Sequence, residues 1–167
     1  MVNSWMKPCV EHKGSEEELV LIIGYGSVLR ADDALGQIVA DYLSQYYQNE
    51  PRVKVRAVHQ LTLDLADDVS KYDLVILIDA YNQSGSQGQL TFEAVYPSTN
   101  IPSPLTHYLQ PGELLATTQT LFGKLPQMML IGLTTDHFNH GEDFSNQAAA
   151  NLSQVFRLVN DLVISAL

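Results

Sequence analysis

Apolar residues form several short runs along this chain. Two unbroken runs, at 19–23 and 73–80, are rich in branched residues, which is typical of strands buried on both faces of a sheet. The segment 53–58 alternates apolar with charged residues, and we expect this wetter strand nearer the edge of the sheet. Segments 89–96 and 127–133 predict two further strands.

Segments whose apolar residues have helical spacing separate these strands. Pro111 suits the first turn of one helix and Gly123 its end, and Ser145 is placed to cap the last helix. A short helix is expected at about 63–70, with Thr62 as its N-cap. The first and clearest helix has apolar residues at i, i+3, i+4, i+7 and i+8, the stripe of an amphipathic helix: Leu35, Ile38, Val39, Tyr42 and Leu43.

Alternating strands and helices predict a three-layer α/β/α sandwich with a mostly parallel sheet. Only seven or eight residues separate the strands at 73–80 and 89–96, fewer than the roughly dozen that a parallel crossover takes. If these two strands are neighbours, the second is antiparallel. We expect one domain at 19–167 after a flexible leader at 1–18, which lacks any periodicity.

A glycine-containing loop and two acids follow the first strand. Gly24 and Gly26 precede Asp32 and Asp33, at the edge where open α/β sheets bind ligands. A dinucleotide fingerprint would need a third glycine where Leu29 stands, and no Walker sequence is present. Because carboxylates repel phosphate, this loop favours a cation.

Two other side chains should reach the same edge. Asp79 ends the apolar run at 73–80, and a proline-bounded loop carries His107. With Asp33 they make an O,O,N set that suits zinc, nickel or another borderline divalent ion. The alternative is structural: Asp33 and His107 could cap helices, and backbone N–H groups could satisfy Asp79.

Three other histidines are candidates for lesser roles. His59 also ends a strand, and it is either a contact at the rim of the cleft or an exposed residue before a helix. His137 and His140 are three residues apart beside Asp136, but in a glycine-containing loop we expect them to face solvent or substrate rather than to form a metal pair.

The composition limits the classes of partner and the cellular location that we expect. The net charge is −10, with nine basic and nineteen acidic residues, which argues against nucleic acid but could help to attract a basic peptide. The single cysteine, Cys9, cannot pair within the chain. We expect a cytoplasmic protein without membrane association, since no run approaches the ~20 apolar residues of a span and the first residues do not resemble a signal peptide.

The segment 23–36 resembles the opening signature of the hydrogenase maturation proteases. Segments 73–80 and 103–109 resemble that family's acid-ending strand and histidine-bearing loop. The similarity also covers 59–62 and the stretch from 130–133 through 144–145, so the resemblance extends over nearly all of 19–165.

The resemblance implies a function and a fold. These endopeptidases remove a C-terminal extension from the large-subunit precursor of a nickel–iron hydrogenase after nickel is loaded, and they cut behind a basic residue. Asp33, Asp79 and His107 match the family's nickel-binding positions, and the nickel belongs to the substrate. The implied fold is a five-stranded mixed sheet between helices, with one antiparallel strand, and we expect a monomer.

The chemistry is less defined than the site, because no Ser–His–Asp order or nucleophilic cysteine is present. One mechanism is of the aspartyl type: nickel positions the tail, and Asp33 or Asp79 handles a proton of water. A non-catalytic nickel-binding chaperone would use the same ligands. A peptidyl-tRNA hydrolase has a similar fold, but it would need a basic RNA-facing surface.

Overall fold

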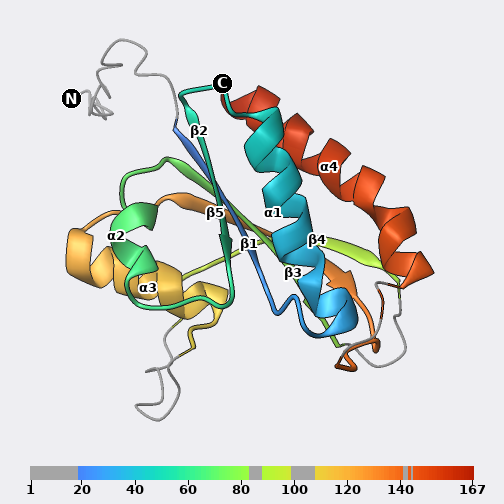
Figure 1. The fold of residues 1–167 in the computed structure, drawn as a ribbon. Helices are drawn as coiled ribbons and strands as arrows, with labels where there is room; N and C mark the ends of the chain where they lie inside the picture. The colour runs from blue at the N-terminus through green and yellow to red at the C-terminus, as the bar shows by residue number, and fades with distance from the viewer. Residues whose placement is uncertain (1–18, 83–87, 99–107, 141–142, 144) are drawn as a thin grey trace, which may run out of the picture.

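The structure is a computed structural model that describes residues 19–82, 88–98, 108–140, 143 and 145–167. The described residues form one five-stranded sheet, ordered β2-β1-β3-β5-β4, with helices on both faces (Figure 1). The expected three-layer α/β/α architecture is therefore confirmed. The strands are β1 (Val20–Tyr25), β2 (Val53–Val58), β3 (Leu74–Tyr81), β4 (Leu90–Ala94) and β5 (Gln127–Thr134).

All neighbouring strands are parallel except β4, which pairs antiparallel with β5. The single antiparallel strand and the edge position of β2 agree with the sequence expectations. β4 is not a neighbour of β3, however, so the short connection between them does not explain its direction. β4 lies beyond β5 at the edge of the sheet and runs antiparallel to it.

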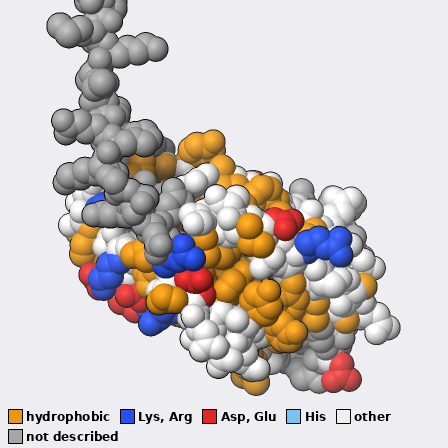
Figure 2. All heavy atoms as spheres, turned by 90° about the horizontal axis from the view of Figure 1, so that it is seen from above, with side chains coloured by type: hydrophobic (Ala, Val, Ile, Leu, Met, Phe, Trp, Pro, Cys, Tyr) orange, Lys and Arg blue, Asp and Glu red, His pale blue; other side chains and the backbone are white. Residues whose placement is uncertain are grey.

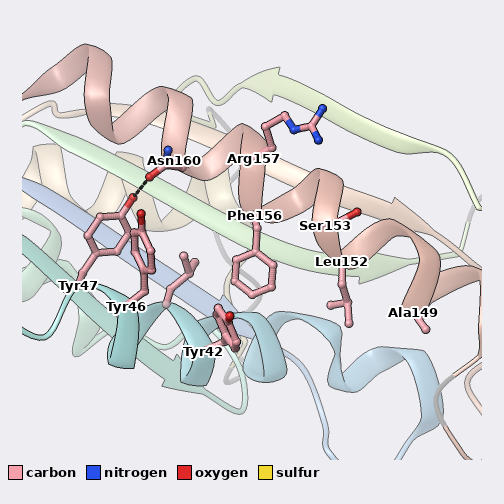
Figure 3. A pocket seen from close by; sticks show the side chains of 10 residues that line it. Tyr42, Tyr46, Tyr47, Ala149, Leu152, Ser153, Phe156, Arg157 and Asn160 are labelled. Atoms are coloured by element: carbon pink, nitrogen blue, oxygen red, sulfur yellow. Dashed lines mark hydrogen bonds between the residues drawn. The ribbon is translucent and has the colours of Figure 1, made fainter.

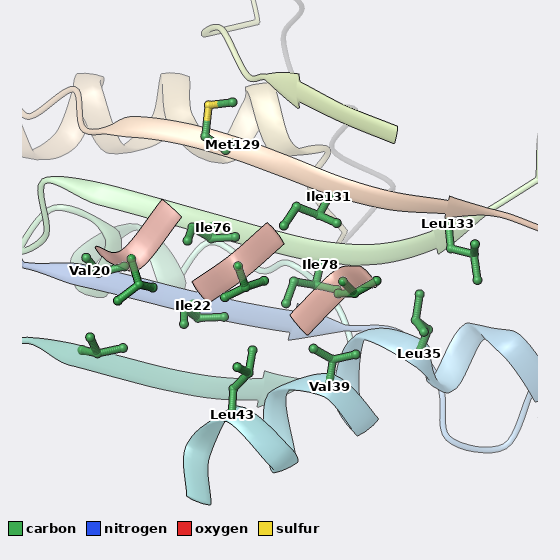
Figure 4. Close-up of a cluster of buried hydrophobic side chains, with 14 of the residues drawn as sticks. Val20, Ile22, Leu35, Val39, Leu43, Ile76, Ile78, Met129, Ile131 and Leu133 are labelled. Atoms are coloured by element: carbon green, nitrogen blue, oxygen red, sulfur yellow. The ribbon is translucent and has the colours of Figure 1, made fainter. Parts of the chain in front are cut away.

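The helices divide between the two faces of the sheet. Buried residues of α1 (Leu35–Tyr46) and α4 (Asn146–Ala166) pack on one face, and those of α2 (Leu65–Val69) and α3 (Pro111–Phe122) pack on the other. In β1, Val20 and Ile22 face the first layer (Figure 4), whereas Leu21 and Ile23 face the second. The run at 19–23 is unbroken because both faces of β1 are covered.

The first helix is rotated from the expected orientation. Ile38 and Tyr42 are exposed, and the buried face includes Gly36 and Ala40 instead. The cause is a close approach to β1: a side chain on Gly24 would come within 1.8 Å of the Gly36 carbonyl oxygen. Small residues let the helix backbone approach the strand, and the larger side chains turn outward.

Most helix ends agree with the sequence. Gly123 has the left-handed φ of 66° that ends α3, and Ser145 Oγ accepts from the Ala148 N–H at 3.0 Å. The Thr62 cap is wrong, because a turn precedes α2 and places Asp64 at its N-cap position. Thr62 instead accepts from the Leu65 N–H through its backbone carbonyl.

The surface and the helices add two observations. No helix in the described residues combines the length and the apolar character that a membrane span needs. The end of the molecule that lies opposite the carboxyl ends of β1 and β3 carries basic, acidic and apolar side chains intermixed (Figure 2). The described residues of that face therefore offer no continuous basic surface for nucleic acid. The leader at 1–18 lies outside the described residues.

Candidate functional site

The loop after β1 is shaped around Asp33. The Ser27 N–H donates to Asp33 Oδ2 at 2.9 Å, and the Gly26 N–H donates to the His59 carbonyl at 3.2 Å. Gly26 has a φ of 131°, and a side chain there would come within 1.9 Å of the Asp33 carbonyl oxygen. Only glycine fits this position, so the loop brings its backbone against the acid.

The neighbouring acid, Asp32, has a structural role. It is buried, with 1% of its surface exposed, and one oxygen accepts from the hydroxyls of Thr135 and Ser145, each at 2.7 Å. The other accepts from the Ser145 N–H at 2.8 Å. Asp32 therefore fastens the end of β5 and the start of α4 to the first loop, and the two adjacent acids have different tasks.

Asp79 lies on β3, two residues before the strand ends at Tyr81, rather than at the tip of the strand. It follows Val75 and Leu77 on the face covered by α2 and α3. Its Oδ1 accepts from the N–H of the next residue, Ala80, at 2.8 Å. The structural alternative for Asp79 was that backbone N–H groups, rather than a ligand, satisfy its carboxylate. This hydrogen bond supplies one such N–H group.

The environment of Asp79 changes its pKa. Burial raises the pKa of Asp79 from its usual 3.8 to about 7, and the charge of Asp33 adds to this rise, while a hydrogen bond from Tyr25 and the Ala80 N–H oppose it. A carboxyl group with this pKa can gain or lose a proton near neutral pH. A cation placed between the two acids would favour the ionised form of both.

Tyr25 is a site residue that sequence reasoning missed. It ends β1 beside β3, and its side chain makes a hydrogen bond with Asp79; burial, followed by the charge of Asp79, raises its pKa far above the ordinary value. The phenol therefore stays protonated and donates. The signal was its spacing: Tyr25 lies two residues after Ile23, on the face that Asp79 shares.

The histidines are only partly placed. His107 lies outside the described residues, so its convergence with Asp33 and Asp79 stays a prediction. The side chain of His59 is exposed, but its carbonyl bond to Gly26 puts it next to the Asp33 loop. The described part of the chain contains no group of three or more His, Cys, Asp or Glu arranged to hold a metal ion.

The loop after β5 carries the other two histidines. His140 is exposed, which agrees with the expectation. The carbonyl of His137 accepts from the Asp32 N–H at 3.1 Å, and its Nε2 lies 3.2 Å from the Asp143 carbonyl oxygen. His137 thus helps to hold this loop against the Asp32 junction, a structural role that the sequence did not suggest.

A cavity of about 550 Å³ lies between α1 and α4. Figure 3 shows Tyr42 of α1 against Phe156 of α4, with ring centroids 4.5 Å apart, and Tyr47 hydrogen-bonded to Asn160. The cavity is in the helical layer on one face of the sheet, whereas Asp79 points to the other face. It is therefore separate from the carboxylate pair.

Comparisons with known proteins give a consistent fold. No protein-family model matches the chain, and no curated protein matches it. Among solved structures, the hydrogenase maturating endopeptidase HybD from E. coli is similar with a TM-score of 0.75 and 21% identity, covering 88% of this chain and 93% of that one.

Two archaeal structures agree. The [NiFe] hydrogenase maturation protease HycI from Thermococcus kodakarensis has a TM-score of 0.67 and 21% identity, with 88% of this chain and 93% of that one covered. The hydrogenase 2 maturation peptidase from a Thaumarchaeota archaeon has a TM-score of 0.65 and 23% identity, with 87% and 98% covered. The chain has the α/β fold of the hydrogenase maturation proteases, as the sequence resemblance implied.

Proposed function

We propose that this protein is an endopeptidase that removes the C-terminal extension of a nickel–iron hydrogenase large-subunit precursor after nickel insertion. The observation that carries the proposal is the pairing of Asp33 with Asp79 at the carboxyl edge of adjacent strands, close enough for one charge to raise the pKa of the other group. The neighbours named as hydrogenase maturation proteases share the fold that creates this edge. The segment 23–36 supports the same function through its resemblance.

Both carboxylates also accept hydrogen bonds from the protein. Asp33 Oδ2 accepts from the Ser27 N–H, and Asp79 accepts from the Ala80 N–H and from the Tyr25 phenol. In the proposed complex Asp33 and Asp79, with the imidazole of His107, bind the nickel that the precursor carries. Nickel is then part of what the enzyme recognises, and precursor without nickel is not cut.

Asp79 can take part in proton transfer. In the free protein its pKa is raised to about 7, and bound nickel would favour its ionised form, which can accept a proton from the attacking water and deliver it to the amine released when the peptide C–N bond breaks. Asp33 contributes negative charge and positions the cation. The proposal includes a cytoplasmic location, a reducing compartment in which the single cysteine, Cys9, stays a thiol.

Incubation with nickel-loaded precursor, followed by mass spectrometry of the large subunit, tests the proposal. The unaltered protein should release the tail, whereas Asp33→Asn, Asp79→Asn and His107→Ala should not. Asp41→Asn is the matched control, because Asp41 is an exposed acid on α1. Tight binding of the loaded precursor without cleavage would identify a nickel-binding chaperone, and efficient cleavage of nickel-free precursor would refute metal recognition.

A further inference from the structure

Four large apolar side chains are exposed on the loops around the carboxylate edge. Val28 and Leu29, after β1, are 62% and 68% exposed, and Leu63 and Tyr108 are 59% and 58% exposed. A single exposed apolar side chain is ordinary. Here, however, two of the exposed residues are consecutive in the loop that also holds Asp33, and the other two lie on loops at the same edge of the sheet.

The first pair belongs to a hydrogen-bonded tip. The Leu29 N–H donates to Ser27 Oγ at 3.4 Å, and the Arg30 N–H donates to the Ser27 carbonyl at 3.2 Å. Arg30 Nε also donates to the Phe138 carbonyl at 3.3 Å. Because this backbone is already fixed, a partner that covers Val28 and Leu29 loses little affinity to the cost of ordering the loop.

The same tip is tied directly to the proposed ligand. Ser27, whose carbonyl and hydroxyl hold the tip, donates its N–H to Asp33. The second pair is carried by the neighbouring loops: Leu63 follows β2, and Tyr108 precedes Leu109, whose N–H donates to the Leu61 carbonyl at 2.9 Å. The first pair is therefore joined to Asp33 by hydrogen-bonded backbone, and the second pair lies on neighbouring loops at the same edge of the sheet.

We propose that two pairs of exposed side chains, Val28 with Leu29 and Leu63 with Tyr108, bind apolar side chains of the precursor polypeptide beside its nickel site. This inference rests on the proposed function and adds the substrate surface that the enzyme recognises. The net charge of −10 disfavours an anionic lipid surface. A second copy of the chain would bring two Asp33 and Asp79 pairs together. A polypeptide carrying a cation complements both the charge and the apolar rim.

The kinetic test uses a double substitution, Val28→Ser with Leu29→Ser. Its KM for nickel-loaded precursor should rise about tenfold or more, which corresponds to about 1.4 kcal/mol, because two apolar side chains lose their burial against the partner. The kcat at saturation should be unchanged, the pattern of lost uniform binding. Leu121→Ser and Ile164→Ser, at positions 65% and 66% exposed on α3 and α4, should leave both constants unchanged.

A binding measurement separates this inference from the peptidase itself. The dissociation constant of nickel-loaded precursor, measured by interferometry, should rise with the double substitution even if the unaltered protein cuts nothing, in which case only the peptidase proposal fails. Cleavage with unchanged KM and affinity in the double variant would overturn the apolar surface and leave the peptidase standing. Self-association that the double substitution abolishes would assign the surface to a second copy and also overturn it.

Discussion

Replacing Asp79 by asparagine should make the free protein more stable at neutral and alkaline pH. The asparagine side chain keeps an acceptor for the Ala80 N–H, so the backbone bond at 2.8 Å can persist. What the substitution removes is an ionisable group that is largely withdrawn from water and lies beside another negative charge. It therefore isolates the cost of ionising this carboxyl group in the folded state.

The sign and size follow from linkage. The folded-state pKa of Asp79 is raised from 3.8 to about 7, so the native state holds a proton that the unfolded state has already lost. The contribution of Asp79 to stability therefore falls as pH rises between the two pKa values. Above the folded-state pKa this contribution no longer changes with pH. The difference between these two pKa values corresponds to about 4 kcal/mol as an upper bound, and the lost bond from Tyr25 leaves an expected gain of about 2–3 kcal/mol.

Urea unfolding of both proteins, without nickel, at about pH 4 and about pH 8 measures this effect. At the lower pH only the lost bond from Tyr25 separates the two proteins, so the variant should be less stable by roughly 1–2 kcal/mol. At the upper pH the variant should have the higher midpoint. Asp41→Asn serves as the exposed control and should follow the unaltered protein. Parallel curves for Asp79→Asn and the unaltered protein across the range would refute the raised pKa and weaken the assignment of Asp79 to proton transfer.

Three further predictions concern the same loop and its neighbours. Tyr25→Phe removes a hydrogen bond that lowers the pKa of Asp79, so the acidic midpoint of the pH–rate profile should move upward; Tyr47→Phe, which loses a 2.9 Å bond far from the site, should leave it in place. Asp32→Ala leaves buried donors unpaired and should cost about 3–5 kcal/mol in urea unfolding; a cost near zero would contradict its anchoring role. Gly26→Ala should cost about 3 kcal/mol or more, because its φ and its contact both reject a side chain; an unchanged unfolding midpoint would show that the loop can rearrange.

The sheet was predictable wherever burial on two faces left a continuous signal. β1 and β3 are apolar along almost their whole length because helices cover both sides, and Ser145 and Gly123 mark helix ends through local chemistry. The orientation of α1 was not predictable from periodicity. Ile38 and Tyr42 satisfy the stripe as well as the buried residues do, and the outcome depends on how closely the helix approaches β1 at Gly24.

The site residues were also predictable from the sequence only in part. Glycines and acids after a buried strand identified Asp33 from sequence, and the apolar run identified Asp79. The different role of Asp32 depended on Thr135 and Ser145, which are distant along the chain and become neighbours only when β5 and α4 are in place. His107, the third predicted ligand, lies outside the described residues and stays a prediction.

The conformation of the loop explains why the adjacent acids Asp32 and Asp33 can have different roles. Ala31, immediately before them, has a φ of 38°, a left-handed conformation that costs a residue with a side chain about 1 kcal/mol or more. Three hydrogen bonds to the buried carboxylate of Asp32 can offset this strain. With Asp32 fixed to β5 and α4, the next residue is turned toward Ser27 and the edge of the sheet. The structural acid therefore sets the position of the proposed ligand, and a rigid Asp33 can bind a cation without first paying the entropy of ordering its loop.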